Sequence, residues 1–239
     1  MKKPETLRHT GFTLVELMVA IVIVAALASL VFAITKNVQQ KARRATCMNQ
    51  QKNATMMLLD SATDNHGRIA VFAGGSGNFD YRPYYVISEQ LGLPRNPTDA
   101  HYPTMKDVMF CPSAPEPQTI HWNTYGINFV PQLRSGAEWQ SESLKDSGGR
   151  TGQLSTLRLA NLKNAANHVL LADSCRSDGQ QIFRISGNDR VALRHGDKAN
   201  VCFADGSGRA LSPDELAKLG FDRAYDANGS KPVSIDLNN

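Results

Sequence analysis

Two groups of ionisable residues in the sequence have types and positions that could do chemistry. The first is Glu16, the one charged residue in segment 12–33, which also has no Pro or Gly. A carboxylate inside an apolar segment needs a partner or a proton, so it marks a functional position. The second is His195 with Asp173 and Asp205, each at the end of a predicted strand. A His and two carboxylates could exchange protons or bind a metal if they converge.

Segment 12–33 must position Glu16, and its length and composition predict a transmembrane helix. As an α-helix it is about 33 Å long, at ~1.5 Å per residue, against a hydrocarbon core of about 30 Å. It is apolar all round rather than on one stripe. The length and the basic flanks disfavour a buried core helix; those flanks are Lys2, Lys3, Arg8, Lys36, Lys41, Arg43 and Arg44.

The helix is expected to continue beyond the membrane. Residues 35–60 have no Pro or Gly and are rich in helix-forming residues. Their apolar positions recur at three- and four-residue spacing, so this half should pack against a globular head. The turn signal at 64–67 is expected to end the helix.

A conventional secretory signal peptide is an alternative interpretation of the N-terminus. It would need a small-residue cleavage site after an apolar core of about 7–15 residues, and 25–28 could serve. The apolar run continues to Ala33, however, and Glu16 is misplaced for such a signal.

The stretch Gly11-Phe12-Thr13-Leu14-Val15-Glu16 follows a short basic leader and opens the apolar helix. It resembles the class III signal of type IV pilins and type II secretion pseudopilins. The resemblance implies that a prepilin peptidase cleaves between Gly11 and Phe12 and methylates the amine of Phe12. It also implies that Glu16 pairs with the N-terminal amine of a neighbouring subunit during assembly.

The resemblance implies an α+β, pilin-like fold, in which a long N-terminal helix packs on a small antiparallel-sheet head and its first half spans the membrane. The expected parts are a leader at 1–11, a transmembrane helix at 12–34, a continuation of the helix at 35–63 and a head at 64–239. Basic residues flank both helix ends, so charge does not orient the helix. The resemblance places it as a single pass in the bacterial inner membrane, with the head in the periplasm.

The head has several local signals of secondary structure. Segment 167–173 reads as an apolar strand, and 190–195 with 199–205 reads as a hairpin, given the short turn between them. The polar, glycine-bearing segment 136–152 reads as a mobile loop. Ser212 is predicted to cap a short helix.

A second resemblance lies in the head. Nine residues separate His195 from Asp205-Gly206, as in the H-X9-DG motif of bacterial pseudopilin-like proteins. Cys111-Pro112, Thr124-Tyr125-Gly126-Ile127-Asn128 and Leu170-Leu171-Ala172-Asp173 resemble the segments that accompany that motif. The first half of the chain is most similar to the major pseudopilin of type II secretion.

The favoured interpretation of His195 and Asp205 is structural. Asp205 would cap the Asp-Gly turn, and His195 would hydrogen-bond a neighbouring loop. The sequence has no serine elbow, zinc-type Cys pair or His-Glu helix motif. No catalytic, cofactor-binding or metal-binding residue is therefore assigned, and the protein is not expected to be an enzyme. An anchored hydrolase or metal-binding domain using Asp173, His195 and Asp205 is the rival.

The four cysteines are Cys47, Cys111, Cys175 and Cys202, and none forms a C-x-x-C pair. An exported head permits disulfides, and one bond is predicted between two of Cys111, Cys175 and Cys202. Cys47, on the long helix, would be a small packing residue.

No cofactor is expected apart from calcium, which heads of this family often bind. Asp222, Asp226 and Asn228 offer oxygen ligands but match no complete loop motif.

The expected function is that of a structural subunit of a type II secretion pseudopilus. The net charge of +4 comes from mixed charges, and basic clusters with interleaved aromatics are missing, so nucleic acid is not an expected partner. The expected partners are copies of the chain and other pseudopilins in a filament, prepilin peptidase, the inner-membrane assembly platform and membrane lipid. A type IV pilus subunit for adhesion or DNA uptake is the alternative.

Overall fold

A computed structural model describes residues 13–75, 82–94, 98–129, 139–145, 149, 151–186, 190–227, 229 and 231–235. The chain divides into two compact units, Met1–Ala42 and Arg43–Asn239. Helix α1 (Leu14–Asp64) begins in the first unit and ends in the second.

The N-terminal part of α1 exposes its apolar side chains. The large hydrophobic residues between Leu14 and Phe32 are more than half exposed. By length and composition alone, this helix could cross a membrane. At its other end, the Gly67 N–H donates to the Ala62 carbonyl at 2.7 Å, and Gly67 has a φ of 73°. This left-handed turn ends the helix where the 64–67 signal predicts.

The second unit holds three further α-helices, three short 3₁₀ helices and twelve strands within the described residues. In chain order they are β1 (Arg68–Gly75), α2 (Pro83–Gln90), η1 (Asp99–His101), α3 (Tyr102–Met109), β2 (Gly126–Asn128), β3 (Trp139–Lys145), β4 (Thr151–Arg158), η3 (Leu159–Asn161), η4 (Ala165–Asn167), β5 (Val169–Ala172), β6 (Ser174–Cys175), β7 (Arg184–Ile185), β8 (Arg190–Ala192), β9 (Ala199–Phe203), β10 (Gly208–Leu211), α4 (Pro213–Ala217), β11 (Arg223–Tyr225) and β12 (Pro232–Ser234).

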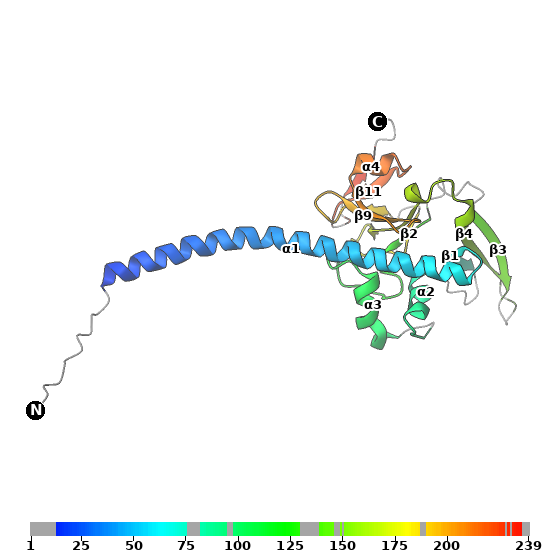
Figure 1. Ribbon diagram of the computed structural model, residues 1–239, viewed down its shortest axis with the longest axis horizontal. Coiled ribbons are helices and arrows are strands. Elements are labelled where there is room, and N and C mark those ends of the chain that lie inside the picture. Colours follow the sequence, from blue (N-terminus) through cyan, green and yellow to red (C-terminus); the bar gives the residue numbers. More distant parts are fainter. Residues whose placement is uncertain are drawn as a thin grey trace, which may run out of the picture. The chain divides into compact units, whose positions relative to one another are not determined.

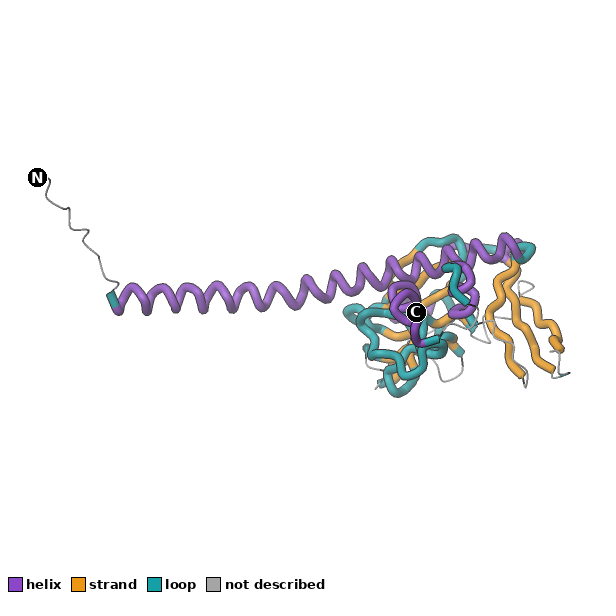
Figure 2. Tube along the Cα trace, turned by 90° about the horizontal axis from the view of Figure 1, so that it is seen from below, coloured by secondary structure: helices purple, strands orange, loops and turns teal. Residues whose placement is uncertain are grey.

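The described strands form three sheets. Their orders are β1-β4-β3, β10-β9-β5-β2-β7 and β12-β11-β8-β6. The first sheet is fully antiparallel and stands apart from the other strands in Figure 2. The other two each contain one parallel pairing, β2 with β7 and β11 with β8.

The C-terminal part of α1 is central to the core of the second unit. Its Ala54, Leu58 and Ala62 are buried with side chains from α2, α3, β5 and β9. Figure 1 shows α2 and α3 on one side of this part of the helix and β9, β11 and α4 on the other. A second apolar cluster joins β9 and β11 to α4. Because the helix is enclosed here, polar side chains on its inner face must find partners in the head.

The structure confirms the predicted α+β, pilin-like fold class, with a long apolar N-terminal helix followed by a sheet-containing head. The capped helix at Ser212 is also confirmed, because Ser212 and Glu215 form a reciprocal capping box. The head is more than one small antiparallel sheet, given its three sheets and two parallel pairings. The part boundaries proposed from sequence stay predictions.

Two local predictions were wrong. Residues 136–152 were expected to form a loop, but β3 and the start of β4 pair there along their length; residues 130–138, 146–148 and 150 lie outside the described part. The hairpin of 190–195 with 199–205 does not form. β9 is buried at every position and pairs with β5 and β10, while β8 pairs with β6 and β11. An apolar strand that gains two neighbours inside a sheet is better buried than one in a hairpin.

Substitution of two glycines in the five-stranded sheet can show how tightly this sheet is packed. A Cβ on Gly126 would lie 2.6 Å from Ser174 Cβ and 2.8 Å from Ile185 Cγ1, both held in strands. We expect Gly126→Ala to lower the free energy of unfolding by about 1–3 kcal/mol, because these neighbours cannot move aside freely. Denaturant titration of the purified full chain in detergent, followed by tryptophan fluorescence, measures this.

Gly208→Ala is the matched control. Its Cβ would lie 3.2 Å from Cys202 Sγ and would approach the flexible Met48 and Lys52 side chains at 2.6 and 2.7 Å. These two side chains can turn away, so the expected change is no more than about 0.5 kcal/mol. Equal losses in the two variants would contradict this account of the packing.

Candidate functional site: a buried cysteine, histidine and aspartate cluster

Four side chains from distant parts of the chain meet in the second unit. Cys47 comes from α1, Cys111 follows α3, Asp173 lies between β5 and β6, and His195 follows β8. Each offers one ligand atom, and the four atoms lie within 4.8 Å of one another. All four residues are buried. We call these four residues the Cys–His–Asp cluster.

Asp173 is the centre of the hydrogen bonding. Its Oδ1 accepts from Gln51 Nε2 at 2.9 Å and from the Cys47 thiol at 3.3 Å. Its Oδ2 accepts from the Asn200 backbone N–H at 3.0 Å and lies 3.1 Å from His195 Nε2. A carboxylate without solvent exposure is strongly destabilising unless it is paired in this way. The carboxylate therefore links α1, β9 and the segment after β8.

Both sulfur atoms have polar neighbours. Cys111 Sγ lies 3.5 Å from His195 Nε2 and accepts from the Ser113 backbone N–H at 3.4 Å. Cys47 Sγ accepts from the buried Tyr125 hydroxyl at 3.4 Å. These thiols are therefore surrounded differently from a cysteine that only fills apolar space.

The cluster shifts the protonation of its members. Hydrogen bonds from Cys47 and His195 lower the pKa of Cys111 to about 7, although burial opposes the shift. Burial alone would lower the pKa of His195, but its hydrogen bonds to Asp173 and Cys111 raise it to about 9. Burial is the largest cause of the raised pKa of Cys47. Of the two thiols, Cys111 is thus the one that becomes a thiolate more readily.

The arrangement suits internal coordination better than reaction with a substrate. Two thiols, an imidazole and a carboxylate form a ligand set that metals bind. The side chains of His195 and Asp173 are only 1% and 0% exposed. A substrate would have no direct access to them, whereas a structural metal site is closed to solvent.

The structure separates the residues that the sequence suggested as one set. Asp173 and His195 converge, as the metal-binding alternative requires. Asp205 does not join them: its exposed carboxylate accepts from the Ser207 N–H at 2.9 Å in the β9–β10 turn. The turn-capping role predicted for Asp205 is confirmed. The contact predicted between His195 and a neighbouring loop is also present, because His195 Nε2 lies 3.5 Å from Cys111 Sγ in the loop after α3. Its burial against Asp173 was not part of that prediction.

The cysteine predictions were partly wrong. All four cysteines are free, so the structure contains no bond between two of Cys111, Cys175 and Cys202. Cys47 is buried, as predicted, but it is also a member of the Cys–His–Asp cluster. One signal could have pointed to it: Cys47 and Gln51 are four residues apart, and therefore lie on one face of the helix.

Glu16 has a local role that the sequence analysis did not assign. Its Oε2 accepts from the Thr13 backbone N–H at 2.9 Å and from the Thr13 hydroxyl at 2.8 Å, while the Glu16 N–H donates back to that hydroxyl at 3.3 Å. This is a capping box at the start of α1. Gly11 and Phe12 lie outside the described residues.

The residues suggested for calcium have other partners. Asp226 Oδ1 accepts from the Lys231 N–H at 3.2 Å, and Asp222 lies 3.8 Å from Arg223. Asn228 lies outside the described residues. A calcium site here stays a prediction.

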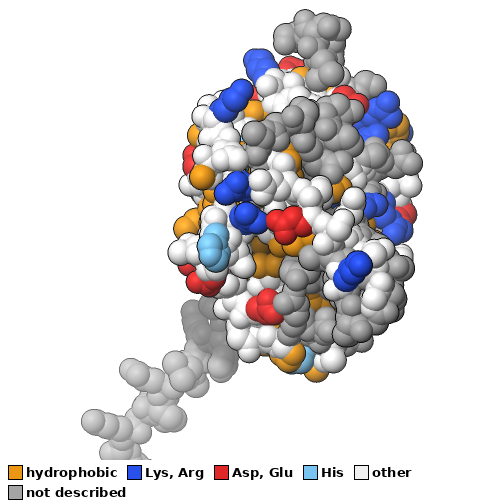
Figure 3. All heavy atoms as spheres, turned by 90° about the vertical axis from the view of Figure 1, so that its right-hand side faces the viewer, with side chains coloured by type: hydrophobic (Ala, Val, Ile, Leu, Met, Phe, Trp, Pro, Cys, Tyr) orange, Lys and Arg blue, Asp and Glu red, His pale blue; other side chains and the backbone are white. Residues whose placement is uncertain are grey.

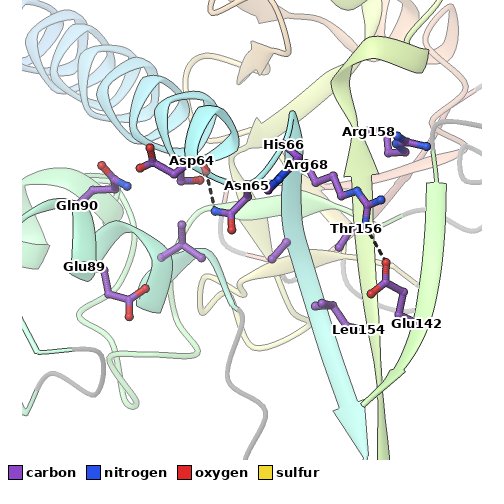
Figure 4. A pocket seen from close by; sticks show the side chains of 13 residues that line it. Asp64, Asn65, His66, Arg68, Glu89, Gln90, Glu142, Leu154, Thr156 and Arg158 are labelled. Carbon is purple, nitrogen blue, oxygen red and sulfur yellow. Dashed lines mark hydrogen bonds and ion pairs between the residues drawn. The ribbon is translucent and has the colours of Figure 1, made fainter.

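A surface groove of about 800 Å³ lies where α1 ends and the β1-β4-β3 sheet begins. Arg68 and Glu142 face each other there at 2.9 Å (Figure 4). Exposed pairs of this kind contribute at most about 1 kcal/mol. On the face drawn in Figure 3, basic and acidic side chains are interspersed. The groove therefore has less distinctive chemistry than the Cys–His–Asp cluster.

Comparison with known proteins identifies the N-terminal signal. Residues 7–32 match the family described as "Prokaryotic N-terminal methylation motif". The chain thus carries a type IV pilin-like prepilin signal on an apolar helix that is a candidate membrane anchor. Such a signal implies processing by prepilin peptidase and assembly with other pilin-like subunits, and indicates a structural subunit. No curated protein and no solved structure shows significant similarity to the chain.

The buried carboxylate can be tested by a change that preserves its shape. We expect Asp173→Asn to lower the free energy of unfolding by about 3 kcal/mol, because His195 would lose its buried counter-charge. Denaturant titration of the full chain in detergent gives the value. The control is Asp205→Asn, an exposed position where either residue can cap the turn, with an expected change within about 0.5 kcal/mol. Similar stabilities for wild type and Asp173→Asn would contradict the assigned role of Asp173.

Proposed function

We propose that the chain is a structural subunit of a type II secretion pseudopilus. The observation that carries this proposal is the methylation motif at residues 7–32, which opens an exposed apolar helix. In this proposal, prepilin peptidase removes residues 1–11 and methylates Phe12. Before assembly the subunit resides in the inner membrane with its head in the periplasm. The assembly platform then adds it to a filament that supports protein secretion.

The exposed part of α1 explains why such a subunit needs two environments. Its large apolar side chains from Leu14 to Phe32 would be unfavourable in water. Lipid covers them before assembly, and helices of neighbouring subunits cover them in the filament. The choice of a secretion pseudopilus over a type IV pilus rests on the resemblance of the first half of the chain to major pseudopilins.

Glu16 has two roles in this proposal, one within its own helix and one between subunits. Its capping box with Thr13 stabilises the helix start, where cleavage after Gly11 would leave Thr13 as the second residue. Its negative charge can also pair with the amine of a neighbouring subunit, which sets the register of the filament. The two jobs need different properties, a hydrogen-bond acceptor in one case and a charge in the other.

The first prediction of the proposal concerns processing. Mass spectrometry of the protein from its native bacterial membrane should find a mature chain that begins with N-methylated Phe12. In cells without prepilin peptidase the same protein should keep residues 1–11. A chain that begins near Ser29 would instead indicate a secretory signal peptide, and either that or an unprocessed Met1 in normal cells would contradict the proposal.

The second prediction separates the two jobs of Glu16. Glu16→Gln preserves the capping box, which accepts Glu or Gln, but removes the charge. We expect Glu16→Gln and Glu16→Ala both to reduce assembled filament at least about tenfold, as follows from losing about 1.4 kcal/mol of pairing. Both should remain in the membrane. Filament yield in sheared and membrane fractions gives the measurement.

Thr13→Ala is the control for this experiment, because it removes the capping hydroxyl and keeps the charge. It should assemble nearly as well as wild type. If Glu16→Gln assembles normally while Glu16→Ala and Thr13→Ala fail, Glu16 acts through the helix cap, and intersubunit pairing is ruled out. Deletion of the chain in its own host separates the filament systems: lost secretion of extracellular proteins supports the pseudopilus, whereas lost surface pili indicate the alternative.

A further inference from the structure

The Cys–His–Asp cluster has the spacing of a tetrahedral metal site. Zinc binds Cys sulfur at about 2.3 Å and His nitrogen or carboxylate oxygen at about 2.0–2.2 Å. At tetrahedral angles these bonds put ligand atoms about 3.5 Å apart for sulfur with nitrogen or oxygen, and about 3.3 Å for nitrogen with oxygen. The structure has 3.5 Å for Cys111 Sγ to His195 Nε2. Asp173 makes comparable contacts through its two different oxygens, at 3.3 Å from Oδ1 to Cys47 Sγ and 3.1 Å from Oδ2 to His195 Nε2. One ligand atom from each of the four residues lies within 4.8 Å of the others.

We propose that Cys47, Cys111, Asp173 and His195 bind one Zn²⁺ ion as a structural site in the head. The proposal goes beyond filament assembly and holds for either filament system. It differs from the calcium expectation in its residues and in its ligand chemistry.

The ligand types select zinc among the common protein metals. Calcium and magnesium take oxygen ligands, so two sulfurs and an imidazole exclude them as the natural occupants. Iron–sulfur clusters are usually held by cysteine alone. A tetrahedral set of two thiolates, one imidazole and one carboxylate suits Zn²⁺, whose structural sites have four protein ligands and no open position.

The residues around the cluster form the outer shell that metal sites require. Gln51 Nε2 and the Asn200 N–H hold the two oxygens of Asp173. The Ser113 N–H and the Tyr125 hydroxyl hydrogen-bond the two sulfurs. Such contacts orient the ligands and tune their basicity. The Oε1 of the buried Gln51 has no hydrogen-bond partner among the described residues. An unused hydrogen-bond acceptor therefore lies beside the cluster.

A zinc ion at this site would connect four segments of the chain that are distant in sequence. Cys47 is on α1, whereas the other ligands follow α3, β5 and β8. Because the unfolded chain has no preformed site, the binding free energy of the ion adds to the stability of the fold. Zinc would therefore fasten the C-terminal part of α1 to the head.

The test uses the full chain, purified in detergent without added metal or chelator. Elemental analysis should find one zinc ion per chain. After chelation under denaturing conditions and refolding, the chain should take up one equivalent of added Zn²⁺. Co²⁺ in its place should give the absorption of tetrahedral thiolate coordination.

Three variants make the result specific. Cys111→Ser removes a ligand and should abolish stoichiometric zinc and the thiolate absorption. Gln51→Ala removes an outer-shell contact and should weaken zinc affinity by about 10–100-fold. Cys202→Ser makes the same chemical change at a buried cysteine outside the cluster and should keep one zinc with unchanged affinity.

Several results would overturn the proposal. These are a folded wild-type chain that neither contains nor takes up zinc, zinc that persists in Cys111→Ser, or a Cys47–Cys111 disulfide in the protein from its native membrane. If Cys111→Ser fails to fold, wild type still decides the matter. Binding of Zn²⁺ should protect two of the four thiols from a thiol reagent, and equal reactivity with and without zinc would contradict the site.

Discussion

Burial of the Asp173 carboxylate is the constraint on which the head depends. A charge with no solvent exposure needs several donors, and here they come from α1, from β9 and from the segment after β8. These partners cannot be met unless the helix, the five-stranded sheet and the later turns are all in place. The hydrogen bonds of Asp173 therefore favour one arrangement of these segments. Apolar packing alone would define that arrangement less well.

The helix α1 meets two different demands along its length. Between Leu14 and Phe32 its apolar side chains are exposed, which suits lipid or neighbouring helices but not water. From Cys47 to Ala62 one face is buried by the head, and it includes the polar Gln51 and Thr55. The same regular helix can serve both, because the α-helix satisfies its backbone hydrogen bonds internally in either environment.

Sequence separation decides which features could be predicted. The apolar helix, the Asp205 turn and the Ser212 cap depend on residues within a few positions of one another, and all three were predicted. The β8–β9 hairpin was also inferred locally, but it lost to pairing with distant strands. The cluster joins Cys47 to Asp173 across 126 residues and Cys111 to His195 across 84. No spacing rule connects such positions, so only the identities of the residues pointed to chemistry.

If the head is exported, as we propose, its two neighbouring thiols can either be oxidised to a disulfide or coordinate a metal. A disulfide would join only Cys47 and Cys111, leaving His195 and Asp173 as a buried ion pair beside it. A zinc ion would use all four groups, and its two positive charges would offset most of the negative charge of the two thiolates and the carboxylate. Moreover, both sulfurs and both carboxylate oxygens accept hydrogen bonds from surrounding residues, as the ligands of a metal site do. In the subunit that we propose, a metal ion at the cluster would join Cys47 on α1 to Cys111, Asp173 and His195 on three further segments. The physical logic of the cluster therefore favours coordination.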